Sequence, residues 1–244
     1  MAVRNTFNVS SKKSAGKLGG LTRIQLHGNP GTPEGRAKGG RNSIRTHANL
    51  KSAFKKIKKI TIPARDARYA EFIGIVIGDG HIDRYQVTVT TNNTTDLPHA
   101  QHVRSLAESL FGITATLRHR SDSLAVVVTL SSKAVCDLLI GEGLPQGSKQ
   151  RLGVCFPEWI RNNGALKMDC VRGLFDSDGC VFQDTHTING KTYRSMGIAF
   201  ANNEPNVLQF FTETLFGLGM HPTQTSKHRV FLRRSSEIER YFEL

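Results

Sequence analysis

The sequence lacks the usual features of membrane proteins, secreted proteins and the common nucleotide-dependent enzymes. Its 244 residues contain no uninterrupted apolar run of about 18 residues, so no transmembrane helix is predicted. The four cysteines form no CxxC pair and follow no secretory leader, which favours reduced, buried thiols in a cytosolic protein. An acid-poor, Lys/Arg- and Ser-containing N-terminus keeps an organellar transit peptide as an alternative. P-loop, nucleophile-elbow and dinucleotide-binding motifs are absent.

Acidic residues are almost missing from the first quarter of the chain. Residues 1–60 contain 14 Lys/Arg and a single acid, Glu34, whereas the remaining residues contain 19 of each sign, so the net charge of +13 lies in this quarter. Such an excess indicates a polyanionic partner. Because the segment is rich in Gly and Pro, it predicts a flexible arm over 1–62 that lies along phosphates, with a short helix allowed at 18–26 or 43–54. A merely solubilising or cleavable tail is the alternative.

Two stretches with matching glycines and aspartates are the most informative part of the sequence. Phe72–Gly80 and Val171–Gly179 are apolar runs that end on Asp-Gly, and each has another glycine five residues before that aspartate. Each run predicts a buried helix that ends at a glycine C-cap. The internal glycines, Gly74 and Gly173, weaken such a helix by roughly 1 kcal/mol relative to Ala. Close approach of another backbone would explain them, which makes both glycines predicted helix-interface residues.

The aspartates at the ends of these helices predict a cation site. Asp79 and Asp178 lie where the helix dipole disfavours an anion by roughly 0.3–1 kcal/mol. If the two helices cross at their glycines, the carboxylates come together, and a divalent cation between them relieves the repulsion. One Asp-Gly after a core helix is explained equally well as a simple turn. The same pattern twice, at matching offsets, favours a site.

The chain after residue 62 is duplicated. Each copy predicts a helix, a strand pair, a helix, a second strand pair and a final helix, with a longer hairpin around 185–192 in the second copy. Asn92-Asn93 in the first copy recurs as Asn202-Asn203 in the second. Trp159, between the copies, is interpreted as a packing anchor. The predicted domains are an arm over 1–62, a first half over 63–144, a linker over 145–168 and a second half over 169–244.

These residues resemble the LAGLIDADG homing endonucleases, whose signature helices end in a metal-binding acid. Ile77 departs from the first signature by replacing an earlier acid, but that acid is not a metal ligand in the family. The resemblance covers about residues 66–244. It implies an α+β fold of two pseudo-symmetric αββαββ(α) halves that pack through the signature helices and hold saddle-shaped antiparallel sheets over DNA. The matching positions are Gly74, Asp79 and Gly80 in the first motif and Gly173, Asp176, Asp178 and Gly179 in the second.

The resemblance implies site-specific hydrolysis of both DNA strands across the minor groove, with Mg²⁺ or Mn²⁺ as cofactor. Ca²⁺ is expected to bind without supporting cleavage. A chain with two motifs acts as a monomeric pseudo-dimer on a long, largely asymmetric duplex site. The implied metal ligands are Asp79 and Asp178 with the backbone carbonyls of Gly78 and Ser177.

Basic residues are expected beside each scissile phosphate in such enzymes. The candidates by strand position are Lys227 with Arg229 in the second half, and Arg118 or Arg120 in the first. Long polar side chains on the strands are expected to read base edges or contact phosphates. These predicted DNA contacts are Arg84, Gln86, Thr88, Thr90, Arg118, Arg120, Gln183, Lys191, Arg194, Lys227 and Arg229.

Two other classes of function stay open at this point. An RNA-splicing maturase or a transcription regulator would use the same fold without cleaving, and loss of Asp79 or Asp178 would indicate it. Both acids are present, which favours a nuclease of the kind encoded within mobile introns. A basic-tailed ribosomal or structural protein would explain the arm but not the paired acids.

Overall fold

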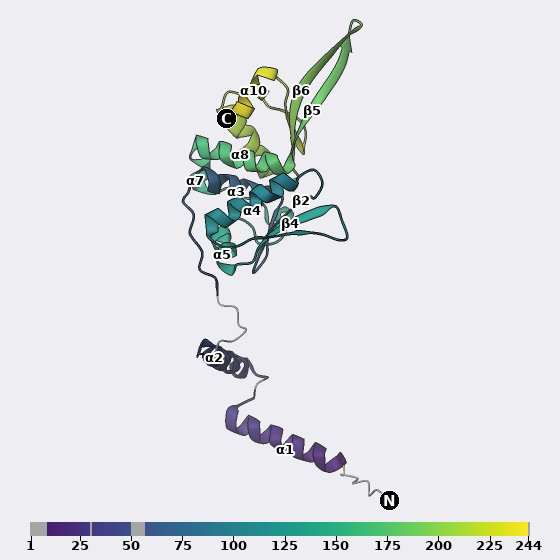
Figure 1. The fold of residues 1–244 in the computed structure, drawn as a ribbon. Helices are drawn as coiled ribbons and strands as arrows, with labels where there is room; N and C mark the ends of the chain where they lie inside the picture. Colours follow the sequence, from purple (N-terminus) through teal and green to yellow (C-terminus); the bar gives the residue numbers. More distant parts are fainter. Residues whose placement is uncertain (1–8, 30, 50–56, 244) are drawn as a thin grey trace, which may run out of the picture. The chain divides into compact units, whose positions relative to one another are not determined.

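The computed structural model describes residues 9–29, 31–49 and 57–243. The chain divides into two compact units, Met1–Lys56 and Ile57–Leu244 (Figure 1). Within the described residues, no helix is both long enough and apolar enough to cross a membrane.

The first unit contains two helices, α1 (Val9–His27) and α2 (Pro33–Asn49). Both are longer than the short helices that the sequence predicted, and the portion of the predicted 43–54 helix beyond residue 49 lies outside the described residues. The start of α2 has a local cause: Pro33 occupies the first helical position, and the Thr32 hydroxyl accepts the Gly35 N–H at 3.0 Å. These capping contacts therefore stabilise a helix in a segment whose high glycine content disfavours helix formation.

The first half of the second unit has the predicted order of elements. Its four strands form one antiparallel sheet in the order β1-β2-β4-β3. A short connection with two single-turn helices follows. These elements are α3 (Ala67–Gly78), β1 (Gly80–Ile82), β2 (Val87–Asn92), α4 (Leu97–Phe111), β3 (Thr116–His119), β4 (Ala125–Leu130), α5 (Lys133–Gly141), α6 (Lys149–Leu152) and α7 (Glu158–Arg161).

The second half repeats this topology. Its sheet has the order β5-β6-β8-β7, which is the order of the first sheet shifted by four strands. The predicted fold class, α+β with two pseudo-symmetric αββαββα halves, is therefore confirmed for this unit (Figure 1). The elements are α8 (Gly164–Asp178), β5 (Gly179–Ile188), β6 (Lys191–Ala201), α9 (Pro205–Gly217), β7 (Thr223–Ser226), β8 (Arg229–Leu232) and α10 (Ser235–Glu243).

Strand alternation fixes one face of each sheet against the helices. In β2, Val87 and Val89 are buried whereas Thr88 and Thr90 lie on the other face. The buried valines pack in the same core as α3 and α4. Burial of one face fixes the register, because a slip of one residue would turn every valine outward. The outer face of β2 thus stays partly exposed, as does the 191–194 end of β6, whereas residues 197–200 of β6 are buried on both faces.

The two halves meet where α3 crosses α8. A Cβ at Gly74 would lie 2.1 Å from the carbonyl oxygen of Cys170, and a Cβ at Gly173 would lie 2.2 Å from that of Glu71. Cys170 and Glu71 each lie three residues before the glycine of their own helix, so the two contacts mirror each other. Neither site has room for a side chain, and this explains both mid-helix glycines. The crossing places the C-terminal ends of α3 and α8 together.

Trp159, in α7, packs as predicted. Its ring stacks on Tyr69 of α3, with centroids 5.5 Å apart, and its indole N–H donates to Glu142 Oε2 at 2.8 Å. The linker is therefore anchored on the first signature helix.

Candidate metal and nucleic-acid site

Helices α3 and α8 bring the two predicted acids close enough for the charge of one to shift the pKa of the other. Asp79 follows the last residue of α3 and is held by its backbone, since its N–H donates to Ile75 O and its carbonyl accepts the Thr90 N–H. Burial and the nearby charge of Asp178 raise the pKa of Asp79 to about 7, against the opposing ammonium of Lys149. Burial also raises the pKa of Asp178. Both carboxylates are thus partly removed from water and disfavour each other's charge.

The predicted backbone ligands lie at the same place. Gly78 and Ser177 are the residues immediately before the two acids, and they touch: a Cβ at Gly78 would lie 2.5 Å from Ser177 Cβ and 3.6 Å from Asp178 Oδ2. The donor set is all oxygen, which suits Mg²⁺ or Mn²⁺ with several retained waters. Among the described residues there is no cluster of three or more His, Cys, Asp or Glu side chains that would hold a metal by itself. Paired, repelling carboxylates with carbonyl oxygens beside them fit a hard divalent cation.

Lys149 is a site residue that the sequence did not reveal. It is the first residue of α6, and its Nζ donates to the carbonyls of Ile77 at 2.7 Å and of Gly78. A longer contact of 3.4 Å reaches Val76 O. The side chain is partly buried, and burial lowers its pKa while Asp178 and Asp79 oppose that effect. Gly78 lies 71 residues earlier in the chain, and no spacing rule connects the two.

Asn202 is a second residue that sequence reasoning passed over. Its Nδ2 donates to Asp178 Oδ2 at 2.8 Å, and its Oδ1 accepts the Glu204 N–H at 2.8 Å. This double contact ties Asp178 to the end of β6. The repeated Asn pair in both halves was the available signal. It was used only as a mark of duplication.

A hollow of about 480 Å³ opens beside these groups. Asp178 and Glu204 line it together with Lys149 and with polar and cationic side chains of the β7–β8 hairpin. The positive charges of Lys149 and Arg229 suit a phosphate. The residues that matter here are Gly78, Lys149, Asp178, Asn202, His228 and Arg229.

The two predicted basic residues of the second half lie in different places. Arg229 lines the hollow with Asp178, whereas Lys227 lines another depression with Gln209 and Glu213 of α9. Lys227 belongs to the turn between β7 and β8, so its side chain need not follow the alternation of Arg229. Arg229 is therefore the better-placed cation of the pair.

The predicted basic residues of the first half also differ from each other. Arg118 is exposed on β3, and among the described residues no ion pair involves it. Arg120 lies just beyond the strand and makes a two-fold contact with Asp122, at 2.9 and 2.7 Å. A paired guanidinium is less available to a phosphate.

The predicted contacts of the first sheet largely share one face. Thr88 and Arg118 flank β4 from opposite sides and lie on its outer face, opposite Thr129 and Val127. Thr90 pairs with Val127 as well. Arg84 and Gln86 lie instead in the β1–β2 turn, where the Arg84 guanidinium stacks on Tyr85 at 5.2 Å.

The predicted contacts of the second sheet divide between its two faces. Lys191 and Arg229 alternate onto the outer face of β6 and β8. Gln183 and Arg194 alternate onto the opposite face, the face that buries Ile198 lower in the sheet. The outer face has an additional cation, Arg233. Its guanidinium lies 4.8 Å from the Phe231 ring centroid and 3.4 Å from Asp184 Oδ2.

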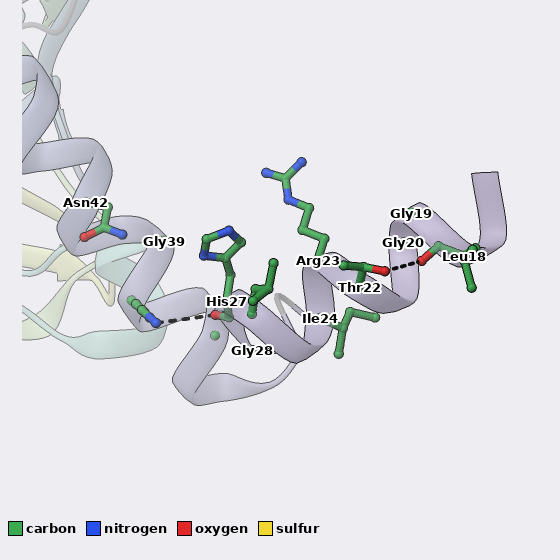
Figure 2. A pocket seen from close by; sticks show the side chains of 13 residues that line it. Leu18, Gly19, Gly20, Thr22, Arg23, Ile24, His27, Gly28, Gly39 and Asn42 are labelled. Carbon is green, nitrogen blue, oxygen red and sulfur yellow. Dashed lines mark hydrogen bonds between the residues drawn. The ribbon is translucent and has the colours of Figure 1, made fainter. Parts of the chain in front are cut away.

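A larger hollow, of about 1140 Å³, lies between α1 and α2 of the first unit (Figure 2). Its lining is glycine, apolar side chains and the cations Arg23 and Lys38, and Lys38 Nζ donates to His27 O at 3.4 Å. Thr22, His27 and Asn42 also line this hollow, but none of its lining residues is a carboxylate. The paired carboxylates predicted from the sequence lie at the helix crossing and not in this larger hollow.

Known proteins with similarity to the chain were compared with it. No protein-family model matches. The chain is 28% identical over 158 residues to the replication factor C small subunit of Methanocaldococcus jannaschii, a match that spans 59% of this chain but only 8% of that protein. The homing endonuclease I-DmoI in complex with DNA and Mn has a TM-score of 0.48 at 16% identity, covering 74% of this chain and 94% of I-DmoI. The N-terminal LAGLIDADG domain of WhiA has a TM-score of 0.47 at 13% identity, covering 75% and 82%.

Proposed function

We propose that this protein is a divalent-metal-dependent, site-specific double-strand DNA endonuclease. The observation that carries the proposal is the meeting of Asp79 and Asp178 at the ends of two helices that cross at glycines, beside a hollow lined with cations. A purely structural role does not explain two partly buried carboxylates that repel each other at helix C-termini. A cation site does.

Some residues of the site would bind the metal, and others would bind the phosphate. Asp79, Asp178 and the Gly78 carbonyl would hold Mg²⁺ or Mn²⁺, which supplies activation of water and stabilisation of the leaving 3′ oxygen. Asn202 fixes the orientation of the Asp178 carboxylate through its 2.8 Å hydrogen bond. Arg229, on the opposite wall of the hollow, neutralises the phosphate. The exposed parts of the outer faces of the two sheets bind the duplex and read its sequence.

The monomer acts as a pseudo-dimer with unequal halves. The two sheets share one topology but differ in strand length and in the side chains of their outer faces. Unequal sheets suit a long, largely asymmetric target. Cleavage of both strands is expected because each half contributes one acid to the central site.

Cleavage of a randomised DNA library in Mg²⁺ tests the proposal. The wild type is expected to produce specific double-strand cuts, and Asp79→Asn and Asp178→Asn are expected to abolish them while retaining DNA binding. Arg151→Ala removes a cation from an exposed position of α6 and serves as a control that should still cut. Specific binding without cutting, in Mg²⁺, Mn²⁺ and Ca²⁺ alike, would favour the maturase or regulator class instead.

The basic first unit is assigned a supporting role in affinity. Its excess of positive charge suits phosphates of any sequence, so it is expected to strengthen binding more than specificity. If about six of its cations contact phosphates, deletion of residues 1–60 should reduce the log–log salt slope of DNA binding by about 5. An unchanged slope would contradict this assignment.

A further inference from the structure

The Lys149 ammonium lies on the same carbonyl that is proposed to bind the metal. Its Nζ donates to Gly78 O and to Ile77 O, the last two carbonyls of α3. These carbonyls form the negative end of the helix dipole and have no partner inside the helix. The ammonium therefore satisfies groups that would otherwise be unpaired.

The same ammonium compensates the two acids. Lys149 attracts both Asp178 and Asp79 electrostatically, and these two acids otherwise repel each other. The side chain reaches this position from α6, in the linker between the halves, so it belongs to neither signature helix. The first half and the second half are thus neutralised at their meeting point by a third element.

An ammonium and a divalent cation compete for this carbonyl. The oxygen has two lone pairs, but two cations bound to the one Gly78 oxygen would lie so close together that they repel each other strongly. Binding of a metal to Gly78 O and the acids therefore requires the Lys149 side chain to move.

We propose that Lys149 is a built-in counter-cation that holds the Gly78 carbonyl of the free protein and is displaced from this carbonyl when a divalent cation binds. This inference rests on the proposed metal site. The displaced ammonium stays attached to α6 at the rim of the hollow, where a DNA phosphate is its natural partner. Metal binding and DNA binding are thereby coupled, because the Lys149 ammonium that the metal displaces forms an ion pair with the DNA phosphate.

Calorimetric titration with Ca²⁺, on the full chain without DNA, tests the competition. Lys149→Met removes the competing charge and should bind Ca²⁺ roughly tenfold more tightly than the wild type. Arg151→Met is the charge-matched control, because it removes a cation from an exposed position of the same helix, α6. Its affinity for Ca²⁺ should change by no more than about threefold.

Thermal unfolding without DNA gives an independent readout. Without metal, Lys149→Met should unfold at a lower temperature than the wild type, and Ca²⁺ should raise its melting temperature by more than it raises that of the wild type. Lys149→Gln, which retains a donor for the carbonyls but no charge, should fold even if Lys149→Met does not, and should also bind Ca²⁺ more tightly.

Equal or weaker Ca²⁺ binding by both Lys149 variants would overturn the inference, as would the absence of Ca²⁺ binding in every variant. Neither readout depends on cleavage, so the two proposals fail separately. A wild type that cuts DNA while its Lys149 variants bind Ca²⁺ unchanged supports the nuclease alone. Tighter Ca²⁺ binding by the variants of a chain that never cuts supports the counter-cation alone.

Discussion

The two halves of the second unit agree at their helices and differ at their sheets. Gly74 and Gly173 make mirrored contacts, with distances of 2.1 and 2.2 Å from each added Cβ to the opposing carbonyl. The first hairpin, in contrast, has strands of 3 and 6 residues, whereas the second has strands of 10 and 11. Symmetry is therefore retained where the two halves must fit each other. It is lost on the strands that face outward.

The acids follow the same division. Their positions at the helix ends are equivalent, but Asp178 is held by Asn202, whereas Asn92, its counterpart in the repeated Asn pair, accepts hydrogen bonds from the N–H groups of Thr94 and Thr95. Among the described residues no side-chain hydrogen bond to Asp79 is present. The difference indicates that the site is symmetric in its ligands and asymmetric in the groups that orient them.

The largest effect is expected from breaking the symmetric contact. Gly74→Ala places a methyl group against the Cys170 carbonyl and should lower the free energy of unfolding by about 3 kcal/mol or more. Gly173→Ala should cost a similar amount because its contact mirrors the first. Urea unfolding followed by circular dichroism measures both. Very unequal losses would contradict the mirrored crossing.

Gly141→Ala is the matched control. Gly141 ends α5, and a Cβ there would have no atom within 4 Å. This change should be neutral or should stabilise the protein by up to about 1 kcal/mol, the difference in helix propensity. A loss as large as that at Gly74 would mean that any methyl group is harmful, and the crossing would not explain the result.

The helix crossing between the two halves could be predicted from the sequence, because its motif occurs twice in the chain. Gly74, Asp79 and their equivalents recur at the same spacing, and two local patterns predicted a single crossing and a single cation site. The hairpin length difference was also visible, since the second copy contains additional residues. The close backbone contacts at the crossing required the structure.

Groups that act through tertiary contact were not predictable in this way. Lys149 lies in the linker, outside both copies of the repeat, and reaches Gly78 only because the linker folds back onto the end of α3. Gln183 and Arg194 were predicted from residue type, and strand register then turned them away from the face that carries Arg229. A one-residue uncertainty in register reverses a side chain's face, so residue type alone does not settle it.

A smaller but still substantial effect is expected on how the free energy of unfolding depends on pH, and it distinguishes the two acids. The pKa of Asp79 is raised from an ordinary value near 4 to about 7, so the folded protein binds more protons than the unfolded chain between these values. The free energy of unfolding of the metal-free protein should therefore fall as pH rises from about 4 to about 7, by up to about 1.4 kcal/mol per pKa unit. Thermal unfolding across this range measures it.

Asp79→Asn should flatten that pH dependence, since the raised carboxyl is gone. Asp178→Asn should reduce it only in part, because burial is the main cause of the Asp79 shift and the Asp178 charge is the second. An Asp79→Asn protein with the full wild-type pH dependence would assign the effect to other groups.

The asymmetry of the orienting groups predicts a smaller effect on metal binding. Asn202→Ala removes the hydrogen bond that fixes Asp178 and should weaken Ca²⁺ binding by about tenfold, in the range observed for groups that orient metal ligands. Asn92→Ala, at the counterpart of Asn202 in the repeated Asn pair, should leave Ca²⁺ affinity unchanged. Calorimetry on both variants compares the halves directly. Equal weakening by the two changes would show that the first half also orients its acid through this asparagine.

The smallest effect is expected on the outer face of the first sheet. Arg118 has no ion-pair partner among the described residues, whereas Arg120 is bound to Asp122 by two hydrogen bonds. A free guanidinium can meet a DNA phosphate without first leaving a carboxylate, so Arg118→Ala should reduce the log–log salt slope of DNA binding by about 1. Arg120→Ala should change the slope by clearly less, because the wild-type charge is already compensated. Fluorescence anisotropy on a duplex of the selected target, at several salt concentrations, separates the two. A larger change at Arg120 would mean that DNA takes this arginine from Asp122, and that ion pairs in the free protein do not predict which cations of this sheet bind phosphate.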